Sequence, residues 1–185
     1  MINDVLNDAD SKMSKSVEAT REEFAAIRAG RANPAMFSKI TAEYYGTQTP
    51  LQQLASFTSQ DAQTILIAPF DITAMGSIER AIRDSDLGVN PSNDGKILRA
   101  VFPELTEERR KEYIKLAKGK AEDGRVSVRN VRRTAKQALE KLEKDGEVGK
   151  DDVTGAEKRL DATTKTHTDK IDELLKHKEA ELLEV

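Results

Sequence analysis

The sequence predicts an α+β protein, an elongated antiparallel three-helix bundle with an inserted small α/β domain of the β/α/β sandwich-like kind. Both ends of the chain repeat apolar residues at helical spacing and contain no proline, so nothing there forbids long helices. The segment from residue 34 to 103 differs, because it holds six of the eight aromatic residues. It also holds all five prolines, Pro34, Pro50, Pro69, Pro91 and Pro103.

The first helix is expected over about Asn3 to Arg28, with its end near Gly30. Apolar residues recur there three or four positions apart, which places them on one helical face. They are Val5, Ala9, Met13, Val17, Phe24 and Ile27.

The second helix is predicted to begin at Thr106, a good N-cap that two glutamates follow, where the helix dipole favours anions. It should run for about 38 residues, or roughly 57 Å, to a break around Gly146 and Gly149. Gly119 and Gly124 each cost this helix about 1 kcal/mol relative to alanine, so we expect local bending there. The predicted buried stripe consists of Tyr113, Ala117, Ala121, Val128, Val131, Ala135, Leu139 and Leu142.

The third helix is expected to start near Asp151 and to repeat its buried positions at alternating spacings of four and three, a coiled-coil period. These positions are Leu160, Thr164, His167, Ile171, Leu174 and Lys178. None of the three helices can bury its stripe alone. We therefore expect them to pack together as one bundle.

Within the insert, Ile40–Tyr44, Thr64–Ile67 and Ile97–Phe102 are predicted strands, and Leu51–Phe57 is a weaker strand or a loop. Residues Ala74–Asp86 place three apolar side chains on one face and stop at a Leu-Gly pair, so one helix should cover a small sheet.

We assign residues 1–30 and 106–185 to the bundle and residues 31–105 to the insert. Two short segments, Ala29–Pro34 and Phe102–Leu105, join the two domains. Two thin connections without a broad shared core favour a hinge between them.

The composition limits the class of protein. With 34% charged and 4% aromatic residues, the chain favours long helices with narrow buried stripes. The absence of cysteine excludes disulfides and thiolate chemistry and fits a reducing compartment. No basic segment followed by an apolar stretch opens the chain, and no apolar run reaches the length of a membrane span. We expect a cytoplasmic protein with no membrane partner.

A row of basic residues on the second helix is the strongest functional signal. Arg125, Arg129, Arg132 and Lys136 recur at helical spacing, with Arg133 beside them. No carboxylate stands three or four positions from Arg129 or Arg132, and like-charge neighbours at those positions cost about 0.2–0.5 kcal/mol each. Planar guanidinium groups also suit phosphate oxygens. This row favours a polyanion over an ordinary solvated face.

The charge distribution agrees with a local nucleic-acid surface. The chain carries a net charge of -3, yet residues 109–133 contain ten basic and three acidic side chains, a local net of +7. Nucleic acid is therefore a plausible partner of one face only. No aromatic residue lies between Arg125 and Lys136, which argues against a base-stacking surface for single strands.

Catalysis is not expected. His167 and His177 are too far apart to share a tight helical ligand site, and His167 is predicted to lie in the bundle seam. Paired carboxylates such as Asp151-Asp152 are most simply N-terminal helix charges. The chain lacks the phosphate-loop, nucleophile-elbow and dinucleotide glycine patterns. We expect no enzymatic activity, no metal and no cofactor.

Tyr44 and Tyr45 are adjacent in a predicted strand, so their side chains should point to opposite faces. One is expected to pack and the other to be exposed, where it is a candidate contact for a partner.

Four separated motifs closely resemble bacterial ribosome recycling factor, and the resemblance covers essentially the whole chain. The motifs are Glu43–Thr47, Thr49–Ala55, Leu105–Lys111 and Val128–Arg133. The resemblance implies an L-shaped molecule in which the bundle forms a rod and the inserted domain an arm. It also implies a monomer that, with elongation factor G and GTP, dissociates the post-termination ribosome into subunits and frees it from messenger RNA. GTP would be used by the partner.

The resemblance implies site residues as well. Contacts with 23S ribosomal RNA of the large subunit, at the subunit interface, would fall on Arg132 first and then on Arg129 and Arg133, with Arg28 and Arg31 at the end of the first helix. The hinge would consist of Gly30, Arg31, Pro103, Glu104, Leu105 and Thr106. No function is assigned to Asn90–Ile97 or Glu147–Asp152, which depart from the family pattern.

Two other interpretations stay open on the residues alone. One is a coiled-coil or adaptor protein whose basic face only aids solubility, and the other is a small hydrolase with an unusual site. Salt-dependent binding to large ribosomal subunits separates the translation factor from the adaptor, because phosphate contacts release counterions. A turnover assay on ester and phosphate substrates tests the hydrolase.

Overall fold

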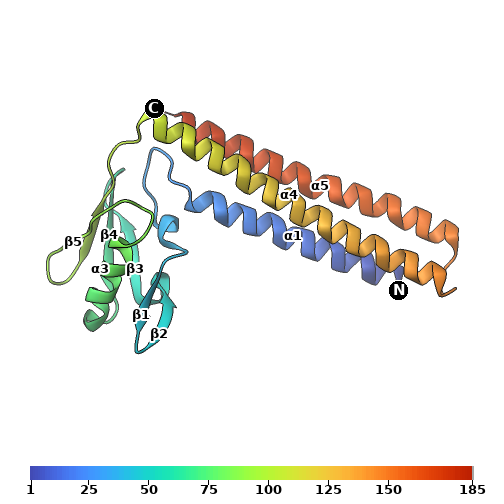
Figure 1. Ribbon diagram of the computed structural model, residues 1–185, viewed down its shortest axis with the longest axis horizontal. Coiled ribbons are helices and arrows are strands. Elements are labelled where there is room, and N and C mark those ends of the chain that lie inside the picture. The colour runs from blue at the N-terminus through green and yellow to red at the C-terminus, as the bar shows by residue number, and fades with distance from the viewer. Residues whose placement is uncertain (185) are drawn as a thin grey trace. The chain divides into compact units, whose positions relative to one another are not determined.

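The computed structural model describes residues 1–184 and divides them into two compact units (Figure 1). The helical unit comprises Met1–Phe24 and Ile114–Ala180. The mixed unit comprises residues 25–113 together with residues 181–184. These units are not cut at the same residues as the domains expected from the sequence, whose borders at 30/31 and 105/106 stay a prediction.

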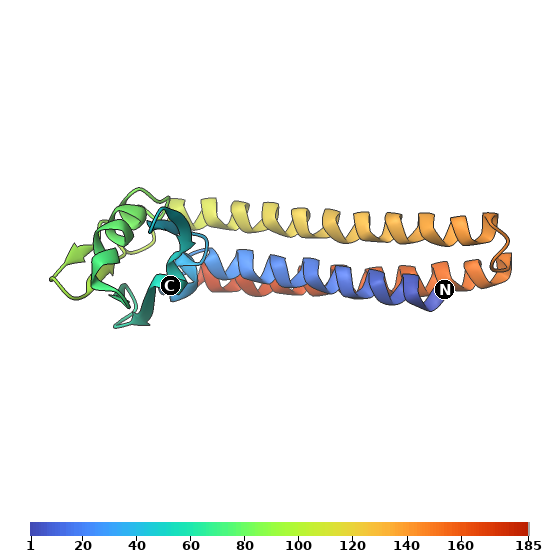
Figure 2. The same cartoon turned by 90° about the horizontal axis from the view of Figure 1, so that it is seen from below.

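Three long helices build the helical unit: α1 (Ile2–Ala26), α4 (Glu107–Lys144) and α5 (Lys150–Leu183). Helix α4 runs antiparallel to α1 and to α5, as both views show (Figures 1 and 2). Contacts between distant segments agree with this order, since the hydroxyls of Ser16 and Ser127 lie 2.8 Å apart. The predicted antiparallel three-helix bundle is confirmed.

The helix boundaries follow local signals. The Thr106 hydroxyl accepts the Arg109 N–H at 3.1 Å, which confirms the predicted N-cap of α4. After α4, Gly146 takes a positive φ of 72° in the turn that leads to α5. Helix α1 ends at Ala26, two residues before the predicted end, so Arg28 and Arg31 follow the helix and are not part of it.

The buried stripe of α4 differs from the prediction in two ways: some predicted residues are only half-buried, and one buried residue was not predicted. Tyr113, Val131 and Leu142 are only half-buried, whereas Ala117, Ala121, Val128, Ala135 and Leu139 are buried as expected. Gly124 belongs to the stripe: a Cβ there would collide with Thr20 Oγ1 and lie 3.1 Å from Ile171 Cδ1. Helix α4 is continuous across Gly119 and Gly124, and local bending there stays a prediction. Gly124 instead permits close packing of three helices.

Helix α5 places its seam largely as predicted, with Leu160, His167, Ile171 and Lys178 buried. Its Thr164 and Leu174 are half-buried. His167 is 4% exposed, and its Nε2 lies 2.7 Å from Asp10 Oδ1 on α1. The seam position predicted for His167 and the surface position predicted for His177 are both confirmed.

The mixed unit holds a four-stranded antiparallel sheet and a separate hairpin. The sheet has the order β3-β4-β6-β5, formed by β3 (Ala55–Ser59), β4 (Thr64–Pro69), β6 (Leu98–Val101) and β5 (Ser92–Asn93). The hairpin pairs β1 (Thr41–Tyr44) with β2 (Thr47–Pro50). Helix α3 (Met75–Arg83) follows the short 3-10 helix η2 (Ile72–Ala74), and a second such helix, η1 (Pro34–Phe37), precedes β1.

Two parts of this unit depart from the sequence-based expectation. Leu51–Phe57 is not a single weak strand, because a helical turn α2 (Leu51–Leu54) comes first and β3 begins at Ala55. Strands β2 and β5 are not predicted from the sequence, because β2 (TQTP) is polar and ends at a proline and β5 consists of only two polar residues. The β1–β2 turn is made by Tyr45 and Gly46, whose φ angles of 49° and 77° suit a two-residue hairpin.

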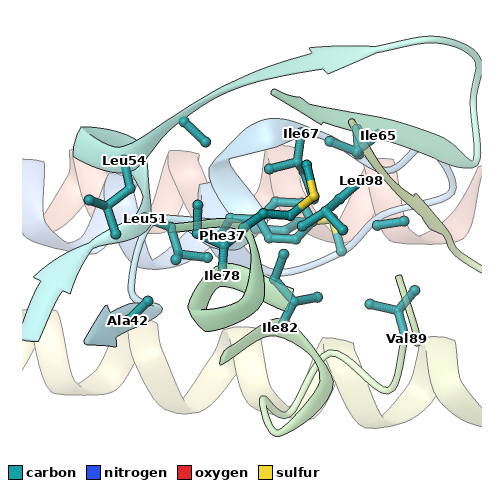
Figure 3. Close-up of a cluster of buried hydrophobic side chains, with 14 of the residues drawn as sticks. Phe37, Ala42, Leu51, Leu54, Ile65, Ile67, Ile78, Ile82, Val89 and Leu98 are labelled. Atoms are coloured by element: carbon teal, nitrogen blue, oxygen red, sulfur yellow. The ribbon is translucent and has the colours of Figure 1, made fainter. Parts of the chain in front are cut away.

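A compact apolar core lies between α3, the sheet and the β1–β2 region (Figure 3). Ile78 and Ile82 of α3 face Ile65, Ile67 and Leu98 of the sheet (Figure 3). The Phe37 ring stacks on Phe57 with 5.0 Å between centroids and meets Phe102 edge-on at 6.0 Å. The sequence-based prediction of one helix covering a small sheet is confirmed.

Candidate nucleic-acid interface

The arginine face of α4, defined as Arg125, Arg129, Arg132, Arg133 and Lys136, lies on one side of the helix. The side chains differ in exposure: Arg125 is 20% exposed, Arg132 38% and Arg129 56%. Arg133 is exposed and Lys136 is half-buried. The exposure of side chains on the arginine face therefore ranges from a largely enclosed guanidinium to freely solvated charges.

Arg125 is held by two carboxylates. Its Nε donates to Asp172 Oδ1 of α5 at 2.8 Å, and its Nη1 donates to Glu122 Oε2 at 3.0 Å. The hydrogen bond with Asp172 is the main cause of a raised Arg125 pKa, with Glu122 adding to it. These contacts tie α4 to α5, so Arg125 serves first as a structural link.

Arg129 and Arg132 also have acidic partners. Arg129 Nη1 donates to Glu122 Oε1 at 3.1 Å, and Arg132 Nε donates to Asp161 Oδ1 of α5 at 2.7 Å. Both arginines stay more than a third exposed, so solvent screens these ion pairs and each stabilises the fold by at most about 1 kcal/mol.

These contacts correct one premise of the sequence analysis. The absence of a carboxylate three or four positions away suggested unrelieved repulsion along the arginine face. Glu122 reaches Arg129 from seven positions away, and Asp161 and Asp172 approach from another helix. Because α4 and α5 are antiparallel, Asp172 in the later part of α5 lies beside Arg125 in the earlier part of α4, and Asp161 lies beside Arg132. This antiparallel order is the signal that could have identified both acidic partners from the sequence.

Arg133 and Lys136 have no carboxylate partner among the residues that the structure describes. Their charges, with the unpaired edge of Arg132, are available to an external anion. In the exposed ion pairs of Arg129 and Arg132, phosphate oxygens can readily replace the carboxylates, because they bind guanidinium groups in the same geometry. The face keeps the chemistry of a phosphate-binding surface, although its role in RNA binding stays a prediction.

The two arginines beyond α1 differ sharply. Arg31 is exposed, whereas Arg28 is 6% exposed and its guanidinium lies 5.5 Å from the Phe102 ring centroid. Burial lowers the pKa of Arg28, and the nearby Arg110 lowers it further, while Tyr113 opposes the shift. Arg28 thus packs against an aromatic ring and is buried, and RNA contact stays a prediction for both Arg28 and Arg31.

The predicted hinge residues lie in two segments without regular structure, around Gly30 and Arg31 and from Pro103 to Thr106. Just after the second segment, Arg110 Nη1 donates to the carbonyl oxygen of Leu182 at 2.9 Å and also to that of Glu184. A hinge role stays a prediction for these six residues.

The tyrosine pair is only partly as predicted: Tyr44 packs and Tyr45 is exposed, but the two rings do not point to opposite faces, because they meet edge-on with 4.6 Å between centroids. The Tyr44 hydroxyl donates to Asp71 Oδ2 at 2.7 Å, and this bond raises the pKa of Tyr44 to about 12. Tyr45 is 85% exposed, and it lies in the hairpin turn instead of on the opposite face of a strand. The sequence could not distinguish the strand end from the turn.

Neither a metal-binding cluster nor a membrane-spanning helix occurs among residues 1–184. No group of three His, Cys, Asp or Glu side chains that could hold a metal ion occurs in this part of the chain. None of the helices described is both long enough and apolar enough to cross a membrane.

Comparison with known proteins gives consistent results. The family model described as ribosome recycling factor matches residues 20–183. A ribosome-recycling factor of Nocardioides sp. is 76% identical over 185 residues, which is all of both chains. The ribosome-recycling factor of Streptomyces coelicolor is 62% identical over 185 residues, again the whole of both chains.

Solved structures give the same result. A solution structure of ribosome recycling factor matches with a TM-score of 0.76 and 38% identity, covering 100% of this chain and 98% of the other. A second matching structure describes models for the T. thermophilus ribosome recycling factor and the E. coli elongation factor G bound to the E. coli post-termination complex. Its TM-score is 0.68 at 41% identity, with both chains covered in full. With sequence and fold matched from end to end, this chain belongs to the ribosome recycling factor family.

Proposed function

We propose that the protein splits the post-termination ribosome into its subunits together with elongation factor G and GTP, and so frees the ribosome from messenger RNA for reuse. The main support is the 76% identity over the whole length of a ribosome-recycling factor. The structural relative bound with elongation factor G to a post-termination complex supports the choice of partner.

The arginine face supports docking on the large subunit. An RNA duplex hides its base edges in a deep major groove, so a protein that binds it mainly contacts phosphates, 2′-hydroxyls and shape. Arg129, Arg132, Arg133 and Lys136 offer the donors that phosphates need, without aromatic residues among them. Binding would thus depend on the RNA backbone more than on its sequence.

The protein needs no active site for this role. Elongation factor G would hydrolyse GTP, and the recycling factor, without a cofactor of its own, would transmit the resulting movement in the cytoplasm as a monomer. The six predicted hinge residues would let the two domains rotate during this step. A cross-link between cysteines introduced near Arg31 and Leu105 would then leave ribosome binding intact and abolish splitting; the chain has no cysteine that would interfere.

Light scattering by purified bacterial post-termination ribosomes tests the proposal. Scattering should fall only when the protein, elongation factor G and GTP are all present, because subunits scatter less than the intact ribosome. Omitting each component in turn provides the controls. A signal no larger than that from elongation factor G and GTP alone would rule the function out.

A further inference from the structure

Arg132 differs from the other paired arginines in which atoms its partner uses. Asp161 Oδ1 takes only the Nε–H of Arg132, at 2.7 Å. Both terminal nitrogens, Nη1 and Nη2, have no hydrogen-bond partner among residues 1–184. Arg125 instead uses Nε and Nη1 on two carboxylates. Arg132 therefore uses only its Nε in this ion pair, and its two terminal nitrogens are open to an anion.

The carboxylate of Asp161 lies close to any anion bound at that edge. A phosphate that accepts hydrogen bonds from Nη1 and Nη2 would be roughly 6 Å from Asp161, judged from ordinary hydrogen-bond lengths. Two negative charges at that distance repel even in water, enough to weaken binding about 3-fold, and more if the interface excludes solvent. Asp161 is 58% exposed and comes from α5, so α4 can fold without it.

The other acidic residues near the arginine face are already committed to structural contacts. Asp172 and Glu122 both hold Arg125, which is only 20% exposed. Removing Asp172 would disturb the link between α4 and α5. Removing Glu122 would disturb the arrangement of the arginines along α4. Asp161 is the acidic partner of Arg132, the residue expected to contact RNA most directly.

We propose that Asp161 is a built-in competitor of ribosomal RNA: its carboxylate occupies the Nε side of Arg132 and limits the affinity of the arginine face for RNA phosphates. This inference rests on the proposed function. A recycling factor must leave the large subunit after each round, and a moderate affinity permits release. Asp161 sets that affinity from α5, outside the row of residues that bind.

Substitution Asp161→Asn separates charge from geometry. The asparagine oxygen still accepts the Arg132 Nε–H, so the guanidinium keeps its orientation while the negative charge is lost. Co-sedimentation with purified large ribosomal subunits at low salt should show binding tightened about 3- to 10-fold. The dependence of affinity on salt should also become steeper, by up to about 0.9 in the log–log slope for one added effective charge.

Asp169→Asn is the matched control. Asp169 lies on the same helix, is 57% exposed and pairs with Lys165 of α5 at 2.7 Å. The substitution changes the net charge by the same amount and should leave affinity and slope closer to those of the wild type. Equal gains from both variants would mean that general charge, and not competition for Arg132, controls binding, and would overturn the proposal.

The double variant Arg132→Ala/Asp161→Asn completes the test. Without Arg132 there is nothing for Asp161 to occupy, so the gain from Asp161→Asn should shrink to that of the control. An unchanged gain, or no gain in the single variant, would also overturn the proposal. Wild-type protein that fails to bind large subunits would instead refute the proposed function. Thermal melting confirms that each variant folds.

Discussion

The two units bury their apolar residues in different ways. In the helical unit the buried positions that α4 contributes are mostly small, as with Ala117, Ala121 and Gly124, and one aromatic side chain, Phe24 of α1, takes part. The mixed unit encloses large side chains around Phe37 and Phe102. Stability in the first therefore depends on how closely three backbones approach, and in the second on how much volume the core fills. Four predictions test this contrast, beginning with the largest effect.

Removing the central ring of the mixed unit should have the largest effect. Phe37 is fully buried and contacts two other rings, so Phe37→Ala should cost about 3–5 kcal/mol of unfolding free energy. Chemical denaturation followed by circular dichroism measures the loss. Phe70, which is 70% exposed, provides the control, because Phe70→Ala should change stability by less than about 0.5 kcal/mol. Comparable losses from both would contradict a volume-filled core.

Arg132→Ala should separate binding from stability in the helical unit. Loss of a charge-assisted contact with phosphate should weaken the large-subunit complex by about 1.5–3 kcal/mol and flatten its salt dependence. Arg132→Lys should recover only part of the affinity, because an ammonium lacks the planar fork. Ribosome co-sedimentation across a salt series measures both.

The same Arg132→Ala variant should remain folded. Its ion pair with Asp161 is exposed, so the unfolding free energy should fall by no more than about 1 kcal/mol, as thermal melting would show. The contact with Asp161 offsets the like-charge repulsion along the arginine face, so we expect no gain in stability from removing Arg132. Normal binding by the alanine variant would return the arginine face to a merely solvated surface.

Two glycines of α4 offer a matched pair. A Cβ at Gly124 meets Thr20 Oγ1, which is fixed by its own bond to the Ser16 carbonyl, whereas a Cβ at Gly119 meets nothing within 4 Å. Gly124→Ala should therefore cost about 1–2 kcal/mol despite its better helix propensity. Gly119→Ala should stabilise by about 0.5–1 kcal/mol. The denaturant midpoints of the two variants measure these stability changes. Changes of the same sign in both variants would show that α1 and α4 are not closely packed at Gly124.

The smallest effect concerns the hydrogen bond from Tyr44 to Asp71. This bond and the donors on Thr73 lower the pKa of Asp71, so the stability that Asp71 adds is present above about pH 4 and is lost as the pH falls through its folded pKa. Tyr44→Phe should lower the melting temperature near neutral pH, and the difference from wild type should shrink in acid. Tyr45→Phe keeps the ring that meets Tyr44 edge-on and leaves the bond to Asp71 in place, so it should have a smaller effect than Tyr44→Phe.

At alkaline pH the contribution of the Tyr44–Asp71 hydrogen bond to stability depends on pH in the opposite direction. The pKa of Tyr44 is raised to about 12, so its contribution is complete below the unfolded value near 10 and is lost as the pH rises through 12. Melting curves between pH 9 and 12 should therefore converge for wild type and Tyr44→Phe. Parallel curves across that range would mean that the bond does not form in solution.

The sequence was most informative where a regular pattern determines structure. Helical spacing and the Thr106 cap predicted α4 to within a residue at its start, and coiled-coil spacing placed His167 in the seam. Strand β5 was missed because two polar residues are held only by pairing with β6. The role of Gly124 depends on Thr20 and Ile171 of other helices, which no local pattern reports.

The candidate site was predicted in part for a related reason. Spacing along one helix identified Arg125 to Lys136, but the partners on α5 required the register between two helices. The burial of Arg28 could not be predicted, because an arginine at the end of a helix gives no sign of the aromatic ring on which it packs. Charge that comes from another element decides which arginines are free.

The uneven placement of aromatic residues has a practical consequence for spectroscopy. All three tyrosines, Tyr44, Tyr45 and Tyr113, belong to the mixed unit, and the chain has no tryptophan. Intrinsic fluorescence therefore reports on that unit and, through Tyr113, on the start of α4, whereas the far-ultraviolet amide signal comes mainly from α1, α4 and α5. One sample thus provides two different optical signals without a label. A single tryptophan introduced into either unit would be the sole indole emitter of the chain, which suits fluorescence measurements of the unfolding of each unit in the isolated protein.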